Sequence, residues 1–159
     1  MNRRDFLRVS GAGLVLAECK SWAGETTASS MLVEAESLKE RGGWVLDQQA
    51  MDKMGAPYLM AHGLGVPVAN AKRSIIVATP GTYHVYARTH NWTSPWYDGD
   101  GPGAFKLTIN GVPLPHTLGT RGSEWHWQYG GAVDLPAGKT ALELQDLTGF
   151  NGRVDAFYF

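Results

Sequence analysis

Closely spaced turn signals divide this chain into segments that are too short for long helices. Its 20 glycines and 8 prolines are spread over 159 residues, with turn sequences at residues 41–43, 79–81, 110–111 and 136–138. The Asn-Gly pair at 110–111 is a favoured two-residue hairpin turn, and Pro-Gly sequences turn because proline fixes φ while glycine tolerates a positive φ. Turns at such close spacing favour a fold built from short strands.

Between the turns, apolar and polar residues alternate with a period of two, as in strands that bury one face. Only residues 37–41 and 48–54 have the pattern of helical turns. The pattern therefore predicts an all-β fold, an antiparallel sandwich or barrel. The predicted strands cover residues 31–36, 44–46, 58–61, 73–78, 82–89, 104–110, 128–135, 140–145 and 153–159.

Two hairpins are predicted from the local sequence. In the first, strands within residues 76–85 flank the Thr-Pro-Gly-Thr turn at 79–82. In the second, residues 107–112 fold back around the Asn-Gly pair in a type I′ turn. Each hairpin would place two consecutive strands side by side in one sheet.

The first 23 residues are typical of an export signal. Arg3 and Arg4 precede a weakly hydrophobic run that is too short to span a membrane, a pattern that resembles the twin-arginine signal. Ala23 completes a cleavage sequence, whereas Cys19 would be the anchor of an alternative lipoprotein sequence. We therefore expect a signal peptide (1–23), a linker (24–30) and one β-sandwich domain (31–159) in the periplasm, at the cell surface or outside the cell.

Charge and cysteine content exclude several classes of protein. Without residues 1–23, ten basic and thirteen acidic residues remain, which gives a formal charge of −3 and leaves no cysteine. A nucleic-acid-binding domain would carry a basic stripe, and a disulfide framework would need cysteine pairs. The chain also lacks a dinucleotide-binding glycine fingerprint and the HExxH metal-binding motif.

Two acidic residues at the first predicted strand allow three interpretations. Glu34 and Glu36 lie two residues apart, so both carboxylates would project from one strand face roughly 7 Å apart. They are either solvated acids on an edge strand, oxygen ligands of a hard cation, or a catalytic pair. The catalytic interpretation predicts a hydrolase that uses Glu34, Asp155 or the pair Asp98 and Asp100.

Aromatic residues gather in two places. Residues 125–129 read Trp-His-Trp-Gln-Tyr, which would put three rings on one face of a strand. Residues 91–103 lack strand character and hold Trp92, Trp96 and Tyr97. Flat aromatic faces bind the apolar side of sugar rings, while core packing is the alternative for the strand residues. Because long irregular segments in compact domains are often functional, the loop aromatics are the better binding-site candidates.

Several of these sequences, taken in order, resemble family 6 and family 35 carbohydrate-binding modules. The similarity extends over most of residues 31–159, although the loop sequences differ from those of the family. It is carried by Val-Glu-Ala-Glu at 33–36, Pro-Gly-Thr-Tyr-His-Val-Tyr-Ala-Arg at 80–88, Asn-Gly at 110–111, Leu-Pro-Ala-Gly at 135–138 and Arg-Val-Asp-Ala-Phe at 153–157.

This resemblance implies an antiparallel jelly-roll β-sandwich that binds a polysaccharide or oligosaccharide without catalysis. It also implies a structural calcium ion held by Glu34, Glu36 and Asp155, and a sugar site among loops at one end of the sandwich. The matching candidates for that site are Trp92, Trp96, Tyr97, Trp125 and Asn151.

A second resemblance is narrower. Residues 88–92 and 146–153 resemble the sugar-module-like region attached to secreted FAD-dependent oxidoreductases of bacteria that degrade polysaccharides. The twin-arginine-type signal agrees with it, because that route exports proteins already folded around a cofactor. Since no flavin-binding fingerprint occurs in these 159 residues, this resemblance implies an accessory domain of a larger enzyme, followed by a catalytic domain and without sugar affinity of its own.

Overall fold

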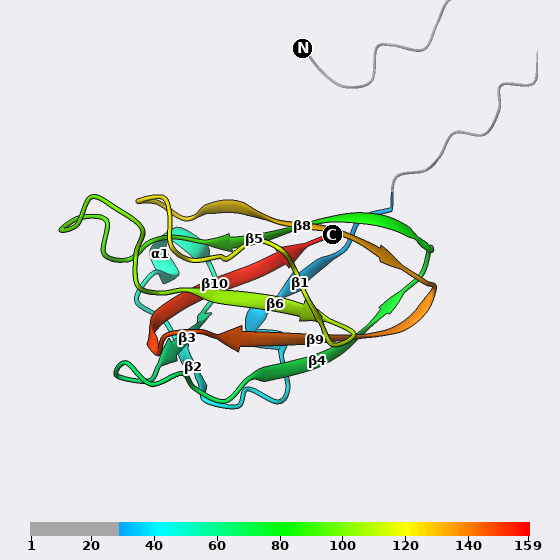
Figure 1. Cartoon of the computed structure of the whole chain (residues 1–159), viewed down its shortest axis with the longest axis horizontal. Helices are drawn as coiled ribbons and strands as arrows, with labels where there is room; N and C mark the ends of the chain where they lie inside the picture. The colour runs from blue at the N-terminus through cyan, green and yellow to red at the C-terminus, as the bar shows by residue number, and fades with distance from the viewer. Residues whose placement is uncertain (1–28) are drawn as a thin grey trace, which may run out of the picture.

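A computed structural model describes residues 29–159, so the expected signal peptide and most of the expected linker lie outside the described residues. Within this part, ten strands and two single helical turns follow one another along the chain (Figure 1). No helix in residues 29–159 is long and apolar enough to cross a membrane. The elements are β1 (Leu32–Glu34), η1 (Ala35–Ser37), β2 (Trp44–Asp47), α1 (Met51–Met54), β3 (Tyr58–His62), β4 (Ala71–Val77), β5 (Gly81–Thr89), β6 (Phe105–Ile109), β7 (Val112–Pro113), β8 (His126–Leu135), β9 (Gly138–Asp146) and β10 (Phe150–Tyr158).

The strands form two antiparallel sheets. Sheet A has the order β2-β3-β10-β5-β8, with β1 also pairing with β10, and sheet B has the order β4-β9-β6-β7. Strands far apart in the sequence are neighbours in both sheets, as expected when the chain passes repeatedly from one sheet to the other. The predicted all-β, antiparallel jelly-roll β-sandwich is confirmed.

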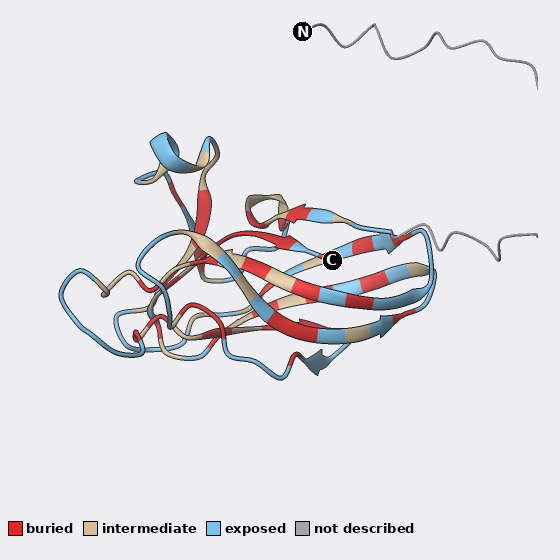
Figure 2. Ribbon diagram, turned by 90° about the horizontal axis from the view of Figure 1, so that it is seen from above, coloured by how far each residue is buried: buried red, intermediate tan, exposed pale blue. Residues whose placement is uncertain are grey.

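The core lies between the two sheets and follows from the alternation seen in the sequence. Buried and exposed residues alternate along the long strands (Figure 2). At the centre, the ring of Trp44 in β2 meets the ring of Phe105 in β6 edge to face, with 5.9 Å between ring centroids. Both side chains are almost fully buried, and because β2 and β6 belong to different sheets, their rings meet between the sheets.

One predicted hairpin is confirmed and the other is wrong. Asn110 and Gly111 have φ values of 49° and 82°, which fit a type I′ turn, and they join β6 to β7. The turn at 79–82 instead carries the chain from sheet B to sheet A, because β4 pairs over its whole length with β9 while β5 pairs with β8 and β10. A local turn signal marks a reversal of direction, but distant strands decide the pairing.

Candidate functional site

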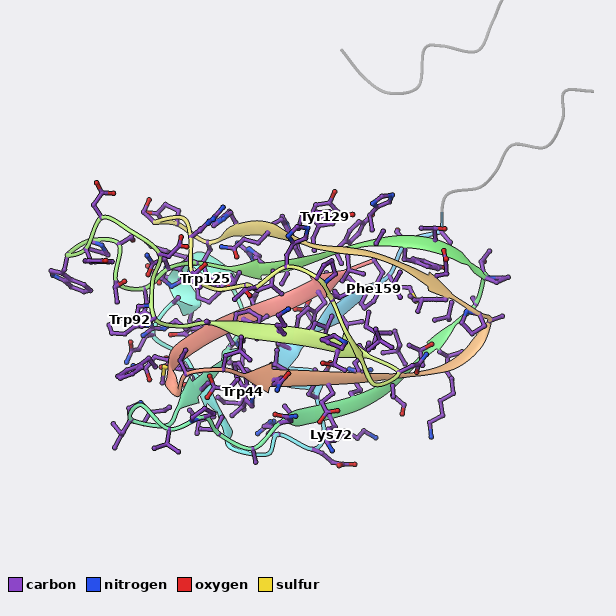
Figure 3. All side chains as sticks on the ribbon, viewed as in Figure 1. Trp44, Lys72, Trp92, Trp125, Tyr129 and Phe159 are labelled. Atoms are coloured by element: carbon purple, nitrogen blue, oxygen red, sulfur yellow. The ribbon has the colours of Figure 1, made fainter. Side chains whose placement is uncertain are left out.

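A hollow of about 310 Å³ opens among loops at one end of the sandwich, the end at which Figure 3 labels Trp92 and Trp125. Its walls come from α1, the start of β3, the segment that follows β5 and the segment that precedes β8. Its aromatic lining consists of Tyr58, His90, Trp92, Trp96 and Trp125, and its charged lining of Asp52, Lys53, Glu124 and Arg153. A concave site with several rings and a few convergent polar groups has the composition of a small-molecule binding site.

Trp125 contributes to this hollow and not to the strand face predicted for it. Strand β8 begins at His126, so Trp125 still belongs to the preceding loop. Its ring lies 4.9 Å from that of Tyr58 and 4.6 Å from that of His90, measured between centroids. Because Tyr58 is buried at the base of the hollow, the Trp125 ring is held against the body of the domain.

Trp92 is fixed by two contacts with β10. Its indole Nε1 donates a hydrogen bond to the carbonyl oxygen of Phe150 at 2.9 Å. The guanidinium of Arg153 lies 5.3 Å from the centroid of the Trp92 ring, within cation–π range. These contacts orient the indole before any ligand binds, which lowers the entropy cost of binding.

The loop that carries Trp92 and Trp96 is organised by the buried side chain of Asn91. Its Oδ1 accepts hydrogen bonds from the backbone N–H and the hydroxyl of Thr93, and its Nδ2 donates to the carbonyl oxygen of Gly99. The loop therefore has an internal polar centre in place of a hydrophobic core. Trp96 is 79% exposed, so its ring is available at the rim of the hollow.

Two of the predicted site residues are not among the residues that line the hollow. The Tyr97 ring lies against Gly99 and is 59% exposed. Asn151 has a left-handed φ of 56° where a bulge interrupts the pairing of β10 with β3, and its Oδ1 lies 2.8 Å from Nδ1 of His62. Trp92, Trp96 and Trp125 are thus brought together, whereas Tyr97 and Asn151 lie outside the hollow.

Burial and neighbouring charges shift the pKa values of His90 and Tyr58, two residues that line the hollow. Burial, with help from the nearby Arg153 guanidinium, lowers the pKa of His90 from 6.5 to about 4. Burial also raises the pKa of Tyr58, although the same guanidinium opposes this shift. At neutral pH the base of the hollow therefore presents a neutral imidazole and a phenol, both able to hydrogen-bond a hydroxyl group.

His90 gives rise to a testable pH dependence. Because its folded-state pKa lies below its unfolded value, the unfolded chain binds more protons between about pH 6.5 and pH 4, and stability is lost as the pH falls through this window. We expect the urea midpoint of the wild-type protein to fall more between pH 7 and pH 4.5 than that of His90→Asn. Raised carboxyl pKa values act equally in both proteins, so equal falls would contradict the prediction.

The predicted metal ligands do not lie on one strand. Glu34 ends β1, while Glu36 lies in the helical turn η1, so the prediction that both project from one strand is wrong. Two hydrogen bonds close this turn, one from the Ser37 hydroxyl to the carbonyl oxygen of Glu34 and one from the Leu38 N–H to the carbonyl oxygen of Ala35. Burial is the largest cause of the raised pKa of Glu36, and the carboxylates of Glu34 and Asp155 raise this pKa further.

Asp155 already has a cationic partner. Its Oδ2 accepts a hydrogen bond from Nη1 of Arg88 at 3.1 Å, and its side chain is only 6% exposed. Burial raises the pKa of Asp155, while the guanidinium of Arg88 opposes that shift. One of the three predicted calcium ligands is therefore engaged by a side chain of the same domain.

These contacts test whether the three acids fit calcium. In favour, Oε2 of Glu36 is buried and has no hydrogen-bond partner in the described part of the chain. Against, Arg88 engages Asp155, and no three His, Cys, Asp or Glu side chains within residues 29–159 converge to hold a metal ion. As folded, the three carboxylates are not arranged as a calcium site, and calcium binding remains a prediction.

A second group of aromatic residues lies on the outer face of sheet A. Trp127 and Tyr129 point outward from β8, where they are 44% and 40% exposed, so neither belongs to the core. Trp127 meets Tyr158 of β10 with 6.1 Å between centroids, and Tyr129 meets Tyr86 of β5 at 5.2 Å. Tyr129 lies far from Trp92 along the length of the sandwich (Figure 3). This face is separate from the hollow.

Comparison with solved structures identifies the fold. The structure is similar to a family 35 carbohydrate binding module from Clostridium thermocellum, with a TM-score of 0.63, 18% identity and coverage of 82% of this chain and 97% of that one. It is similar to the GH26-CBM35 β-(1,4)-mannanase of Podospora anserina, with a TM-score of 0.62 and 18% identity, covering 81% of this chain and 27% of the mannanase. A CBM36-1 domain of a multidomain xylanase from the hindgut metagenome of Trinervitermes trinervoides gives a TM-score of 0.54 at 18% identity, with coverage of 82% and 95%.

A scan against protein-family models and a search of curated proteins gave no match. The fold of this chain is therefore assigned from structural similarity alone, which at 18% identity establishes the fold and no more. The domain has the β-sandwich fold of carbohydrate-binding modules. It matches whole isolated modules over nearly their full length, but only 27% of the length of the mannanase.

Proposed function

We propose that this domain is a non-catalytic carbohydrate-binding module that binds sugar in the hollow at its loop end. The observation that carries the proposal is the convergence of three tryptophans, Trp92, Trp96 and Trp125, on one concave site that also holds hydrogen-bonding groups. Aromatic rings would stack on the apolar face of a sugar ring, while the polar groups would bind its hydroxyls. The fold shared with carbohydrate-binding modules supports this assignment.

Affinity gel electrophoresis against a panel of soluble polysaccharides tests the proposal. Mannan, xylan, galactan and polygalacturonate cover neutral and acidic chains, and we expect at least one of them to retard the domain. The absence of retardation by any of the panel, together with no signal on a glycan array, would refute sugar binding.

Trp92→Ala should weaken the retardation by the glycan identified in that screen. Loss of one pre-oriented stacking ring is expected to lower the affinity by about tenfold, which corresponds to about 1.4 kcal/mol. The melting temperature of the variant should be measured alongside, because Trp92 also bonds the carbonyl oxygen of Phe150. Unchanged retardation of a folded variant would remove Trp92 from the site.

A second candidate function is that of an accessory domain of a secreted FAD-dependent oxidoreductase, whose loops pack on a partner domain. The exposed apolar side chains of the loop at 91–103 favour it, since the consecutive residues Trp96 and Tyr97 are 79% and 59% exposed. Large exposed apolar groups that lie together are typical of interaction surfaces. This candidate predicts no affinity for any glycan, and a dinucleotide-binding fingerprint encoded downstream of this chain.

Three further expectations accompany the proposal. Export through a twin-arginine-type signal at residues 1–23 would bring the domain to extracellular polysaccharides. Attachment to a polysaccharide-degrading enzyme would give its sugar binding a purpose. Calcium held by Glu34, Glu36 and Asp155 would stiffen the fold, and Asp155 would then exchange Arg88 for the metal ion.

A further inference from the structure

Strands β5 and β10 bring a guanidinium to the place where the resemblance implies calcium. Arg88 projects from the outer face of β5, and the register of β10 shifts between Val154 and Ala156, which leaves Asp155 at a bulge. A bulge re-aims the side chain of its extra residue. Here it directs the Asp155 carboxylate to Arg88, with 3.1 Å between Oδ2 and Nη1.

The surroundings of this pair are acidic. Glu34 pairs across from Ala156, the residue next to Asp155, and Glu36 follows two residues later in η1. After burial, the largest cause, the carboxylate of Glu34 contributes to the raised pKa of Asp155, and that of Asp155 to the raised pKa of Glu36. Carboxylates gathered at a partly buried site repel one another and need a cation nearby. Arg88 supplies one from within the chain, at a side-chain exposure of 30%, whereas the 6% exposed Asp155 has little access to water.

We propose that Arg88 is the fixed counter-ion of this acidic cluster and takes the place of a structural calcium ion, so that the stability of the domain does not depend on calcium. The pair is held by its strands, because Arg88 and Ala156 are register partners. A guanidinium cannot lose its charge at any pH at which the domain is folded, and it bonds a carboxylate with defined geometry. Calcium binding at the same carboxylates would require Asp155 to leave this partner.

The wild-type protein provides the first test. Its melting temperature is measured in EDTA and in about 5 mM calcium chloride, a concentration that would saturate even a weak extracellular site. A ligand that binds the folded state alone raises the melting temperature, so our proposal predicts agreement of the two values within about 1 °C. A clearly higher value with calcium would overturn it in favour of calcium at Glu34, Glu36 and Asp155.

Variants of Arg88 provide the second test, with a matched control. Arg88→Met leaves a buried carboxylate without its partner, and we expect the melting temperature to fall by roughly 6–12 °C. Arg121→Met breaks an ion pair with Asp100 at a similar distance of 3.2 Å, but both of those side chains are more than 60% exposed. Such exposed pairs contribute little, so the control should lose no more than about 2 °C.

Two more variants separate the charge from the shape of the side chain. Arg88→Lys keeps a cation at the site and should recover most of the loss, and Arg88→Met with Asp155→Asn removes both charges and should recover part of it. The single variant Arg88→Met should also become sensitive to calcium, because its three carboxylates then lack a counter-ion. If Arg88→Met is no less stable than Arg121→Met, the proposal is wrong; if it does not fold, the lysine variant and the wild-type measurement decide.

Discussion

Replacement of Asp146 by alanine is expected to lower the free energy of unfolding by about 3 kcal/mol or more. Asp146 ends β9, is 3% exposed, and accepts hydrogen bonds from three backbone N–H groups. These belong to Val68 at 2.8 Å, Thr148 at 3.1 Å and Gly149 at 2.9 Å. Without the carboxylate, one buried and two partly buried donors from two different loops lose their partner, and each unsatisfied group carries a desolvation penalty.

Urea unfolding provides the measurement, with the slope of the transition checked for two-state behaviour. Asp134→Ala is the control, because Asp134 is an exposed strand residue that bonds only the hydroxyl of Thr82, and it should change stability by no more than about 0.5 kcal/mol. Asp146→Asn retains one acceptor oxygen, so its free energy of unfolding should lie between those of Asp146→Ala and Asp134→Ala. Equal stability of the two alanine variants would contradict the role assigned to Asp146.

Much of the fold could be predicted from the sequence because burial on one face of a strand leaves a visible period of two. The alternation within residues 82–89 and 140–145 predicts β5 and β9 with errors of one or two residues at their ends. The two-residue strand β7 is too short to show any period, and only the Asn-Gly turn before it predicted that the chain folds back there. Pairing was not predictable in the same way, as the partner residues of β4 lie 61–73 positions further along the chain, in β9, and those of β5 lie 37–54 positions further along, in β8.

Of the residues that line the hollow, the sequence predicted only the tryptophans. Tryptophans in a segment without strand character point to a binding site, and Trp92 and Trp96 do line the hollow. Tyr58 and His90 were missed, because Tyr58 begins a predicted strand and His90 directly follows one, so each looks like part of a strand. They meet at the hollow because β3 begins and β5 ends beside the same part of β10, where Val154 pairs with both Leu59 and Thr89, and no local pattern encodes this sheet order.

The sequence did not predict the irregularities of the backbone either. Strand β10 contains two register shifts, one at Asn151 and one at Asp155, and both re-aim a polar side chain. The resemblance implies a sugar ligand at the first position and a calcium ligand at the second. The structure instead gives them protein partners, His62 and Arg88. Both roles stay predictions, and the protein partners of the two residues depend on strands that are far away in the sequence.

Under the proposed function, Trp125→Ala should cause the largest loss of sugar affinity of any single substitution, about 30-fold or more, which corresponds to about 2 kcal/mol. Its ring is the one that contacts both Tyr58 and His90, at 4.9 Å and 4.6 Å between centroids. Its removal would take away a stacking face and also release the two polar rings beside it. By contrast, Trp96 is 79% exposed at the rim, so Trp96→Ala should cost less.

Isothermal titration with the glycan identified in the gel screen measures these losses, and thermal unfolding of each variant shows that the fold persists. Trp127→Ala is the matched control, because Trp127 is only two residues away but lies on the outer face of sheet A. If the hollow is the site, Trp127→Ala binds like the wild-type protein. If Trp127→Ala loses affinity and Trp125→Ala does not, the aromatic face formed with Tyr158 and Tyr86 is the binding surface, and the assignment of the hollow is wrong.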